Sequence, residues 1–320
     1  MREQSYRLAT YVRGNDEPRA GIVVDDALLD VSALLAKRVE KSSGSSPTQV
    51  LQVLEKWQQL HPLLQQAACD ARSGKSGAHA TPARDVRFLA PILYPGTIFC
   101  AGANYRDHVA EMSKAMNLPP EPDPHEAGLK PWHFIKAAGT ITGPGATIKA
   151  ADYAKELDWE IELAAVIGRP CKDVPEEKAL NYVAGYVASN DLSARDRGRR
   201  PGIEPTSFFK MDWSKHKSFD GSCPIGPWIT PASDIDDPQQ LALKLWVNDS
   251  LKQDSNSSKM LFSLAEQIEQ LAINMTLHPG DIILTGTPAG TGAESGEFLK
   301  AGDVVKVWIE GIGEFSNKIA

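Results

Sequence analysis

Apolar residues along this 320-residue chain follow two different spacings, and the spacing changes near residue 85. Before that point, short apolar runs at Tyr6–Val12 and Ala20–Val24 flank the turn GNDEP, which predicts a β-hairpin. Residues Thr48–Asp70 carry apolar side chains at helical spacing, and Pro62 predicts an interruption of that helix. We therefore expect a small N-terminal α+β domain over residues 1–85.

Residues 86–320 are dominated by short apolar runs between turns rich in glycine and proline. Helical spacing is found at Asn104–Met116 and Ser263–Asn274, whereas Glu111–Pro131 has little periodicity and several prolines. A long segment of that kind in a compact domain is often a functional lid. The runs predict a second, mainly β domain with inserted helices; they are TIFCAG, HFIKAA, IELAAVIG, YVAGYVAS, LALKLWVND, DIILTGTP and DVVKVWIEGIG.

Composition excludes several classes of partner. The hydrophobic content of 42% is sufficient for a large core, and the net charge of −7 argues against a nucleic-acid partner. No apolar run approaches the ~18 residues of a membrane span, and the N-terminus lacks the apolar centre of a signal peptide. The four cysteines are scattered without a C-x-x-C pair, as in a reducing compartment. We expect a cytoplasmic protein that binds neither nucleic acid nor membranes.

The segment LDWEIEL carries the first candidate chemistry. On a strand, Glu160 and Glu162 point to the same side, and carboxylates about 7 Å apart repel each other unless a cation lies between them. Asp191 follows the next apolar run and adds a third carboxylate. Three carboxylates suit Mg²⁺ or Mn²⁺ better than zinc. The alternative is a solvated strand face, because Glu156 and Asp158 share the parity of the pair.

The segment ANYRDHVAEM offers a candidate base. His108 and Glu111 are three residues apart and share a face of the predicted helix. A glutamate beside a histidine fixes its tautomer and raises its basicity, which suits a general base that acts on water. The alternative is a surface pair on an amphipathic helix.

Two further features suit an anionic substrate. In Ile283–Gly292, a strand is followed by threonines and glycines, whose amides and hydroxyls could hold a carboxylate; a simple turn is the alternative. The segment lacks the pattern of a nucleotide-binding loop. Three cations lie in or next to strand-like segments: Lys136, Arg195 and Lys217. Any of them could neutralise a carboxylate or an enolate. The alternative is that they are surface charges.

Together these segments resemble the fumarylacetoacetate hydrolase family over roughly residues 91–320. The resemblance implies a mixed β-sandwich roll, hence a mainly β fold of the α+β class, and a homodimer. The aromatic stretch Phe208–Trp213 would suit a dimer interface, or could belong to the core. The matching elements are GANYRDHVAEM, the F-x-K of HFIKAA, LDWEIELAAVIG, GYVASNDLSARD, HKSFDGSCPIGPW and PGDIILTGTPAGTG.

The resemblance also implies roles for single residues. It implies that the acidic trio binds Mg²⁺ or Mn²⁺ and that the His–Glu pair belongs to a lid. Lys217 becomes a catalytic lysine and Thr287 a contact to the substrate carboxylate, while Arg195 and Lys136 fall near the substrate. The chain departs from some acylpyruvate-cleaving members at Gly198, where those members carry a glutamine. The implied sets are Glu160, Glu162 and Asp191 for the metal, His108, Glu111 and Lys217 for catalysis, and Arg195, Lys136 and Thr287 for substrate.

The resulting hypothesis is a metal-dependent hydrolase that cleaves a carbon–carbon bond in a 2,4-dioxo acid. Acylpyruvates of aromatic catabolism, such as fumarylpyruvate or maleylpyruvate, are examples. One alternative keeps the site and changes the reaction to isomerisation or decarboxylation of a 2-hydroxy-dienedioate, or to decarboxylation of oxaloacetate. Another alternative is a protein without catalytic activity that binds a dicarboxylate as a sensor or scaffold.

Overall fold

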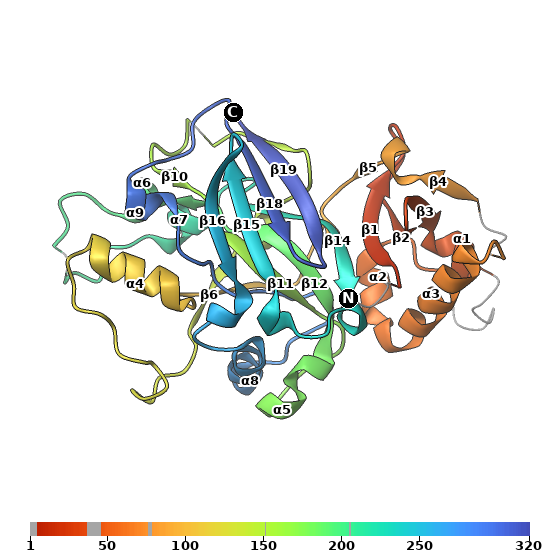
Figure 1. Cartoon of the computed structure of the whole chain (residues 1–320), viewed down its shortest axis with the longest axis horizontal. Coiled ribbons are helices and arrows are strands. Elements are labelled where there is room, and N and C mark those ends of the chain that lie inside the picture. The colour runs from red at the N-terminus through yellow and green to blue at the C-terminus, as the bar shows by residue number, and fades with distance from the viewer. Residues whose placement is uncertain (1–4, 37–45, 76–78, 151, 205) are drawn as a thin grey trace.

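The computed structural model describes residues 5–36, 46–75, 79–150, 152–204 and 206–320. A small N-terminal unit of strands and helices lies beside a larger unit in which two sheets are surrounded by helices and loops (Figure 1). The mixture of sheets and inserted helices confirms the predicted α+β class. The segments that the sequence pattern predicted as strands are strands, from β6 (Ile98–Ala101) to β18 (Val304–Ile309).

The N-terminal unit contains the predicted hairpin. Strands β1 (Arg7–Val12) and β2 (Arg19–Val24) pair antiparallel with Leu8 opposite Ile22. The sheet continues through β3 (Ala27–Asp30) to β4 (Ala80–Pro82), and β5 (Arg87–Phe88) pairs with β1. Helices α1 (Val31–Leu35), α2 (Val50–Glu55) and α3 (Trp57–Arg72) complete the unit.

The predicted helix interruption at Pro62 is wrong. The break lies at Lys56, whose φ of −116° and ψ of 26° separate α2 from α3, and Pro62 lies inside α3. Proline removes one hydrogen bond from a helix. Burial of Trp57, Leu60 and Leu64 along α3 supplies the packing that keeps the helix intact around it.

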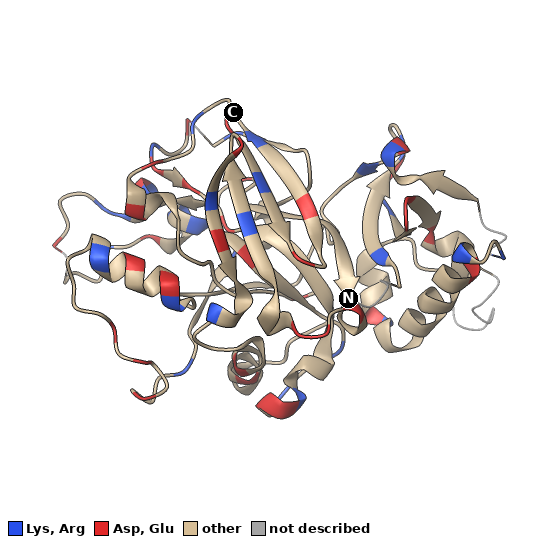
Figure 2. Cartoon of the chain, in the orientation of Figure 1, with Lys and Arg blue, Asp and Glu red and all other residues tan. Residues whose placement is uncertain are grey.

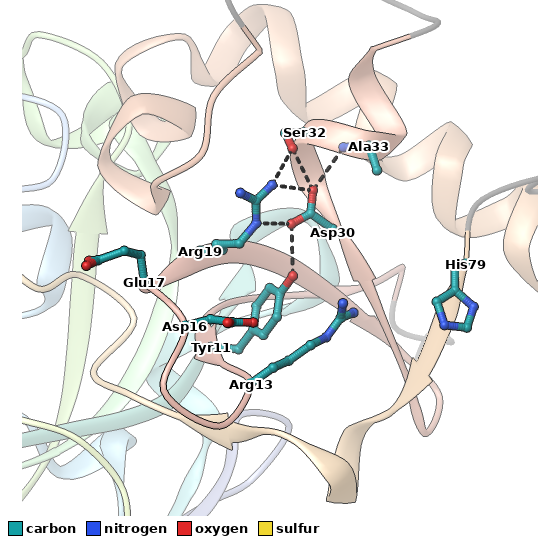
Figure 3. A pocket seen from close by; sticks show the side chains of 9 residues that line it. All are labelled: Tyr11, Arg13, Asp16, Glu17, Arg19, Asp30, Ser32, Ala33 and His79. Atoms are coloured by element: carbon teal, nitrogen blue, oxygen red, sulfur yellow. Dashed lines mark hydrogen bonds and ion pairs between the residues drawn. The ribbon is translucent and has the colours of Figure 1, made fainter.

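Asp30 joins the hairpin to the first helix (Figure 3). Its carboxylate accepts hydrogen bonds from Tyr11 Oη at 2.8 Å, from Arg19 Nε at 2.7 Å and from the backbone N of Ala33 at 2.9 Å. The last of these bonds caps the N-terminus of α1. These bonds and the Arg19 guanidinium hold the pKa of Asp30 well below its usual range, although burial acts to raise it. The polar groups of Tyr11, Arg19, Asp30 and Ser32 in this hollow of the N-terminal unit thus bond to one another.

The main sheet runs through both units. Strand β1 pairs with β14 (Cys223–Pro231), with Leu8 opposite Ile229. From β14 the order continues through β12 (Val183–Asn190), β11 (Ile161–Ile167), β17 (Ile282–Leu284) and β6 to β7 (His133–Lys136). One apolar cluster includes Leu8 and Leu54 together with Val166 and Ile229. The division predicted near residue 85 stays a prediction, since the sheet and this cluster both cross it.

The second sheet lies against the main sheet. Its order is β16 (Ser250–Asn256), β15 (Ala242–Val247), β18, β19 (Gly313–Ile319) and β9 (Thr147–Ile148). Leu163 and Ala165 of β11 share an apolar cluster with Leu243, Leu245 and Val307. Strand β8 (Ile141–Thr142) pairs with β14 and belongs to the main sheet, and β10 (Leu157–Asp158) and β13 (Ser193–Ala194) form a two-stranded sheet. The helices around the sheets are α4 (Arg106–Ala115), α5 (Glu176–Ala179), α6 (Arg195–Gly198), α7 (Trp213–Lys217), α8 (Leu264–Asn274) and α9 (Gly292–Ser295).

The predicted helices at Asn104–Met116 and Ser263–Asn274 are α4 and α8. Because α4 continues to Ala115, the segment expected to form a lid begins after that helix rather than at Glu111. No helix in the described ranges is long and apolar enough to cross a membrane. Acidic and basic positions are interspersed along α4 and across the second sheet (Figure 2).

Candidate metal centre and active site

Strand register brings the three predicted metal ligands together. Ile161 of β11 pairs with Asn190 at the end of β12, so the register places Glu160 opposite the residue that follows Asn190, and Glu162 lies two residues further along the same segment. That residue is Asp191, whose backbone N donates to the carbonyl of Glu160 at 2.8 Å. One carboxylate oxygen from each of the three ligands lies within 4.8 Å of the others, and all three side chains are buried.

The segment LDWEIEL is not one continuous strand. Leu157 and Asp158 form β10, which pairs with β13 in a separate small sheet, and β11 begins at Ile161. Asp158 is fully buried, so the alternative of a solvated strand face is wrong for this residue. Its carboxylate accepts from the backbone N of Gly292 at 2.6 Å and of Ala293 at 3.0 Å. Asp158 therefore fixes the first turn of α9 next to the acidic cluster.

Three cations contact the cluster. Lys217 Nζ lies 2.8 Å from Glu160 Oε2 and 2.7 Å from Asp191 Oδ2. Lys136 Nζ contacts Asp191 Oδ1 and donates to the carbonyl of Leu192 at 3.1 Å. Arg195 bridges Asp158 at 2.9 Å and Glu160 at 2.5 Å. Lys136 and Lys217 are buried, so the alternative of surface charge is wrong for them.

Glu162 differs from the other two ligands. Among the described residues, no Lys or Arg nitrogen forms an ion pair with it, and its Oε2 accepts from the backbone N of Gly286 at 2.7 Å. Burial, and then Asp191 and Glu160, raise the pKa of its carboxyl well above the usual value. Lys217 and Arg195 instead lower the pKa of Glu160 far below its usual value, against the opposing effect of burial. A buried carboxylate without a counter-charge, in an all-oxygen donor set, fits a divalent metal.

His108 is oriented by a residue other than the predicted one. Its Nδ1 lies 3.1 Å from Glu294 Oε1 of α9, whereas Glu111 accepts a hydrogen bond from the backbone N of Gly290 at 2.7 Å. The predicted His108–Glu111 pair is therefore corrected to His108–Glu294, because α9 reaches the imidazole and Glu111 holds the neighbouring loop. The contact with Glu294 also ties His108 to α9, whose first turn is held by Asp158 of the acidic segment.

Glu294 was missed by sequence reasoning. It lies in TGAESGE, and nothing in that segment signals contact with a helix near residue 108. Burial acts to raise the pKa of Glu294, but His108 and the Thr291 hydroxyl outweigh burial and lower it. The residue is therefore held as a carboxylate beside the imidazole.

Thr287 is buried in the loop that follows β17. The preceding residue, Gly286, donates to Glu162, which places this loop against the cluster. Thr287 Oγ1 lies 2.9 Å from Nε2 of Gln253 on β16. Gln253 is a second residue that the sequence pattern did not single out, since it lies in the unremarkable strand SLKQDSN.

Aromatic side chains lie next to Lys217. The Phe134 ring centroid is 5.3 Å from Lys217 Nζ, and Trp213 stacks on Phe134 with centroids 5.2 Å apart. Trp132 meets Trp213 edge-on at 6.0 Å and packs on Gly102, where an added Cβ would lie 2.0 Å from the indole. Trp132 and Trp213 remain 49% and 43% exposed, so they form an apolar wall open to solvent beside the cluster.

The sequence profile described as fumarylacetoacetate (FAA) hydrolase, C-terminal, matches residues 97–320. This match covers more than half of the chain, and the chain therefore belongs to the fumarylacetoacetate hydrolase family, as the resemblance of its motifs predicted.

Its relatives have more than one activity. The chain is 38% identical over 247 residues to a mitochondrial oxaloacetate tautomerase of Xenopus laevis, a match that covers 76% of this chain and 72% of the relative. It is 37% identical over 237 residues to a 2,4-didehydro-3-deoxy-L-rhamnonate hydrolase of Sphingomonas, with 73% and 76% covered. The family thus includes enzymes that hydrolyse and enzymes that tautomerise.

A solved structure extends the comparison over the full chain. Maleylpyruvate hydrolase from Sphingobium, in complex with manganese(II) and pyruvate, superimposes with a TM-score of 0.71. Sequence identity is 27%, and 98% of each chain is covered. The fold of this chain therefore occurs in a protein that binds a divalent metal and a keto acid.

Proposed function

We propose that this protein is a divalent-metal-dependent hydrolase that cleaves the C3–C4 bond of a 2,4-dioxo acid of the acylpyruvate type. The single observation that carries the proposal is the buried trio of Glu160, Glu162 and Asp191 next to the His108–Glu294 pair. The manganese and pyruvate in the structure of the related maleylpyruvate hydrolase support it. Mg²⁺ or Mn²⁺ held by the trio would act as a Lewis acid toward the carboxylate and 2-oxo oxygens of the substrate.

His108 would transfer the protons of the reaction, and Glu294 would orient its imidazole. The Glu294 carboxylate, 3.1 Å from Nδ1, would keep the proton of the neutral His108 imidazole on Nδ1, which would leave Nε2 to take a proton from water. The resulting hydroxide adds to C4, the C3–C4 bond breaks, and its electron pair forms the enolate of pyruvate. The proton on His108 returns to C3. The products are a carboxylic acid and pyruvate.

The cations Lys217, Lys136 and Arg195 neutralise and position the carboxylates of the cluster. Lys217 lies between Glu160 and Asp191, and its charge would stabilise the developing enolate. Lys136 and Arg195 are engaged with the carboxylates of the cluster, which supports positioning roles rather than the direct substrate contacts expected of them. Thr287 would bind the substrate carboxylate. The wall of Trp132, Phe134 and Trp213 would face the acyl group.

The second candidate is a tautomerase, isomerase or decarboxylase at the same site. The similarity to the oxaloacetate tautomerase favours it, and those reactions need no attacking water. Product analysis on acylpyruvates, oxaloacetate and a 2-hydroxy-dienedioate with Mg²⁺ or Mn²⁺ separates the candidates. Hydrolysis gives two fragments and no CO₂. Interconversion of enol and keto oxaloacetate without cleavage of any acylpyruvate would rule out the hydrolase.

We also propose that the protein is a homodimer. Phe208 and Phe209 are 101% and 68% exposed, and Ile203 is 42% exposed in the same loop. Contiguous exposed aromatic and aliphatic side chains are typical of a surface covered by another protein. The loop leads directly into α7, which carries Trp213 and Lys217, so a partner seated on it would also border the active site.

A further inference from the structure

Gln253 connects the strand of metal ligands to the loop of Thr287. It lies on β16 and is fully buried. Its Oε1 lies 2.9 Å from the backbone N of Ile161, the residue between Glu160 and Glu162. Its Nε2 lies 2.9 Å from Thr287 Oγ1 and 2.8 Å from the carbonyl oxygen of Pro288.

The partners of Gln253 leave only one orientation for its amide. The backbone N of Ile161 can only donate a hydrogen bond, and the carbonyl oxygen of Pro288 can only accept one. A flipped amide would place donor against donor at Ile161 and acceptor against acceptor at Pro288. The NH₂ group therefore faces Thr287, and the Thr287 oxygen is the acceptor in that bond.

This bond decides what Thr287 can offer to a ligand. A hydroxyl has one proton to donate, and a bond accepted from Gln253 leaves that proton free. Within the described part of the chain, no protein acceptor for it is found. Gly286, the preceding residue, binds Glu162, so the free proton lies in the loop that borders the carboxylate cluster.

We infer that Gln253 is a positioning residue that makes Thr287 a dedicated hydrogen-bond donor toward a carboxylate oxygen of the keto acid. The inference rests on the proposed function only in taking a keto acid as the ligand. Without Gln253, the Thr287 hydroxyl could turn its proton toward the Pro288 carbonyl or another neighbouring acceptor. The loop of Thr287 would then present no hydroxyl proton to an anion beside the carboxylate cluster.

A double-mutant cycle on ligand binding tests this role. Oxalate serves as the probe because it is planar and, like a 2-oxo acid, presents a carboxylate next to a second carbon that carries oxygen. Calorimetric titration of oxalate into the Mn²⁺-loaded protein needs no turnover, so the result stands apart from the reaction catalysed. Thr287→Val and Gln253→Met should each weaken oxalate binding by about 10- to 100-fold, the range for a hydrogen bond to a charged group.

The double variant provides the decisive comparison. If Gln253 acts through Thr287, adding Gln253→Met to Thr287→Val should change oxalate affinity by less than about twofold, since the donor is already gone. Multiplicative losses would overturn the inference. So would unchanged oxalate binding in Gln253→Met, or a wild-type protein that binds Mn²⁺ without binding oxalate.

Mn²⁺ affinity separates positioning of Thr287 from support of the metal ligands. Gln253 also holds the backbone at Ile161, so a structural role would weaken Mn²⁺ binding in Gln253→Met. The inference requires Mn²⁺ affinity to stay within about threefold of the wild type while oxalate affinity falls. If Gln253→Met does not fold, Gln253→Asn keeps a buried amide but is too short to reach Thr287, and the same cycle applies. Failure of the proposed hydrolase would appear separately, as the absence of cleavage products from the wild type.

Discussion

His108 and Glu294 form the contact that completes the candidate active site, with Nδ1 and Oε1 3.1 Å apart. The two residues come from α4 and from the short helix α9, whose first turn is held by Asp158. The proposed base is thus tied to the same acidic segment that supplies two metal ligands. Movement of α9 would change the direction of the imidazole and the surroundings of the cluster together.

Replacement of Glu294 tests this pair. In Glu294→Gln, the imidazole loses the carboxylate that fixes its tautomer, so kcat should fall roughly 10- to 100-fold with little change in KM. In His108→Ala, kcat should fall further, by roughly 10²–10⁴-fold, because the base itself is removed. Steady-state kinetics on the compound that the product analysis identifies as substrate measures both.

Glu111→Gln is the matched control for Glu294→Gln. Glu111 accepts from the backbone of Gly290 rather than from the imidazole, so its amide variant should retain kcat within about threefold. A larger loss in Glu111→Gln than in Glu294→Gln would restore the pairing predicted from the sequence.

The two glutamates of the metal site should respond in opposite ways when no metal is bound. In chelator, Glu160→Gln removes one of the two buried carboxylates that pair with Lys217 and one of the two that pair with Arg195, and it should lower the free energy of unfolding by about 1.5–3 kcal/mol. Glu162→Gln removes a buried carboxylate that has no cation partner, so it should be neutral or stabilising. Urea unfolding measures both changes.

Addition of Mn²⁺ should make Glu162→Gln less stable than the wild type. The wild type gains stability through binding, whereas Glu162→Gln should gain little, since it lacks one ligand. A fall in metal affinity of at least about 10²-fold is expected for Glu162→Gln by calorimetry. Full Mn²⁺ stabilisation of that variant would contradict a metal at this carboxylate.

His125 ties the predicted lid segment to α8 in a pH-dependent way. Its Nε2 lies 2.7 Å from Glu266 Oε1, and this contact raises the pKa of the His125 imidazole against the opposing effect of desolvation. A raised pKa means that the tie is complete below the ordinary histidine pKa of about 6.5 and is lost as pH rises through the raised value. The pair is exposed, so the effect is modest.

Hydrogen exchange measures this tie. After correction for intrinsic rates, protection in residues 118–129 should fall up to about fivefold between pH 6 and pH 9. His125→Gln should show the reduced protection at both pH values. Equal, pH-dependent protection in wild type and variant would show that another group controls the segment.

Phe208 tests the proposed homodimer. The wild type should have twice the 34.8 kDa mass of the chain in light scattering. Phe208→Ser should shift it toward the monomer at low micromolar concentration, because an exposed aromatic anchor is removed. Tyr94→Ser, which removes another exposed aromatic residue (79%) outside the loop of Phe208, is the control and should leave the mass unchanged. A monomeric wild type would end this proposal.

The local parts of the site could be predicted from the sequence, and the distant contacts could not. Glu160, Glu162 and Asp191 stand at the ends of adjacent strands, so parity and the order of apolar runs were sufficient to group them. Glu294 reaches His108 only because Asp158 holds α9 in place, a contact between residues 134 positions apart. No spacing rule covers such a contact. Gln253 is similar, since its amide has partners only once β11 and the loop of Thr287 lie beside it.

The pairing of β1 with β14 has a consequence for any shortened form of the protein. A chain that started after residue 85 would leave β14 with a free edge along Ile229 and would uncover the apolar side chains that now pack on Leu8 and Leu54. An open edge of this kind recruits other strands. Self-association through that edge, rather than a smaller working enzyme, is the expected fate of such a fragment.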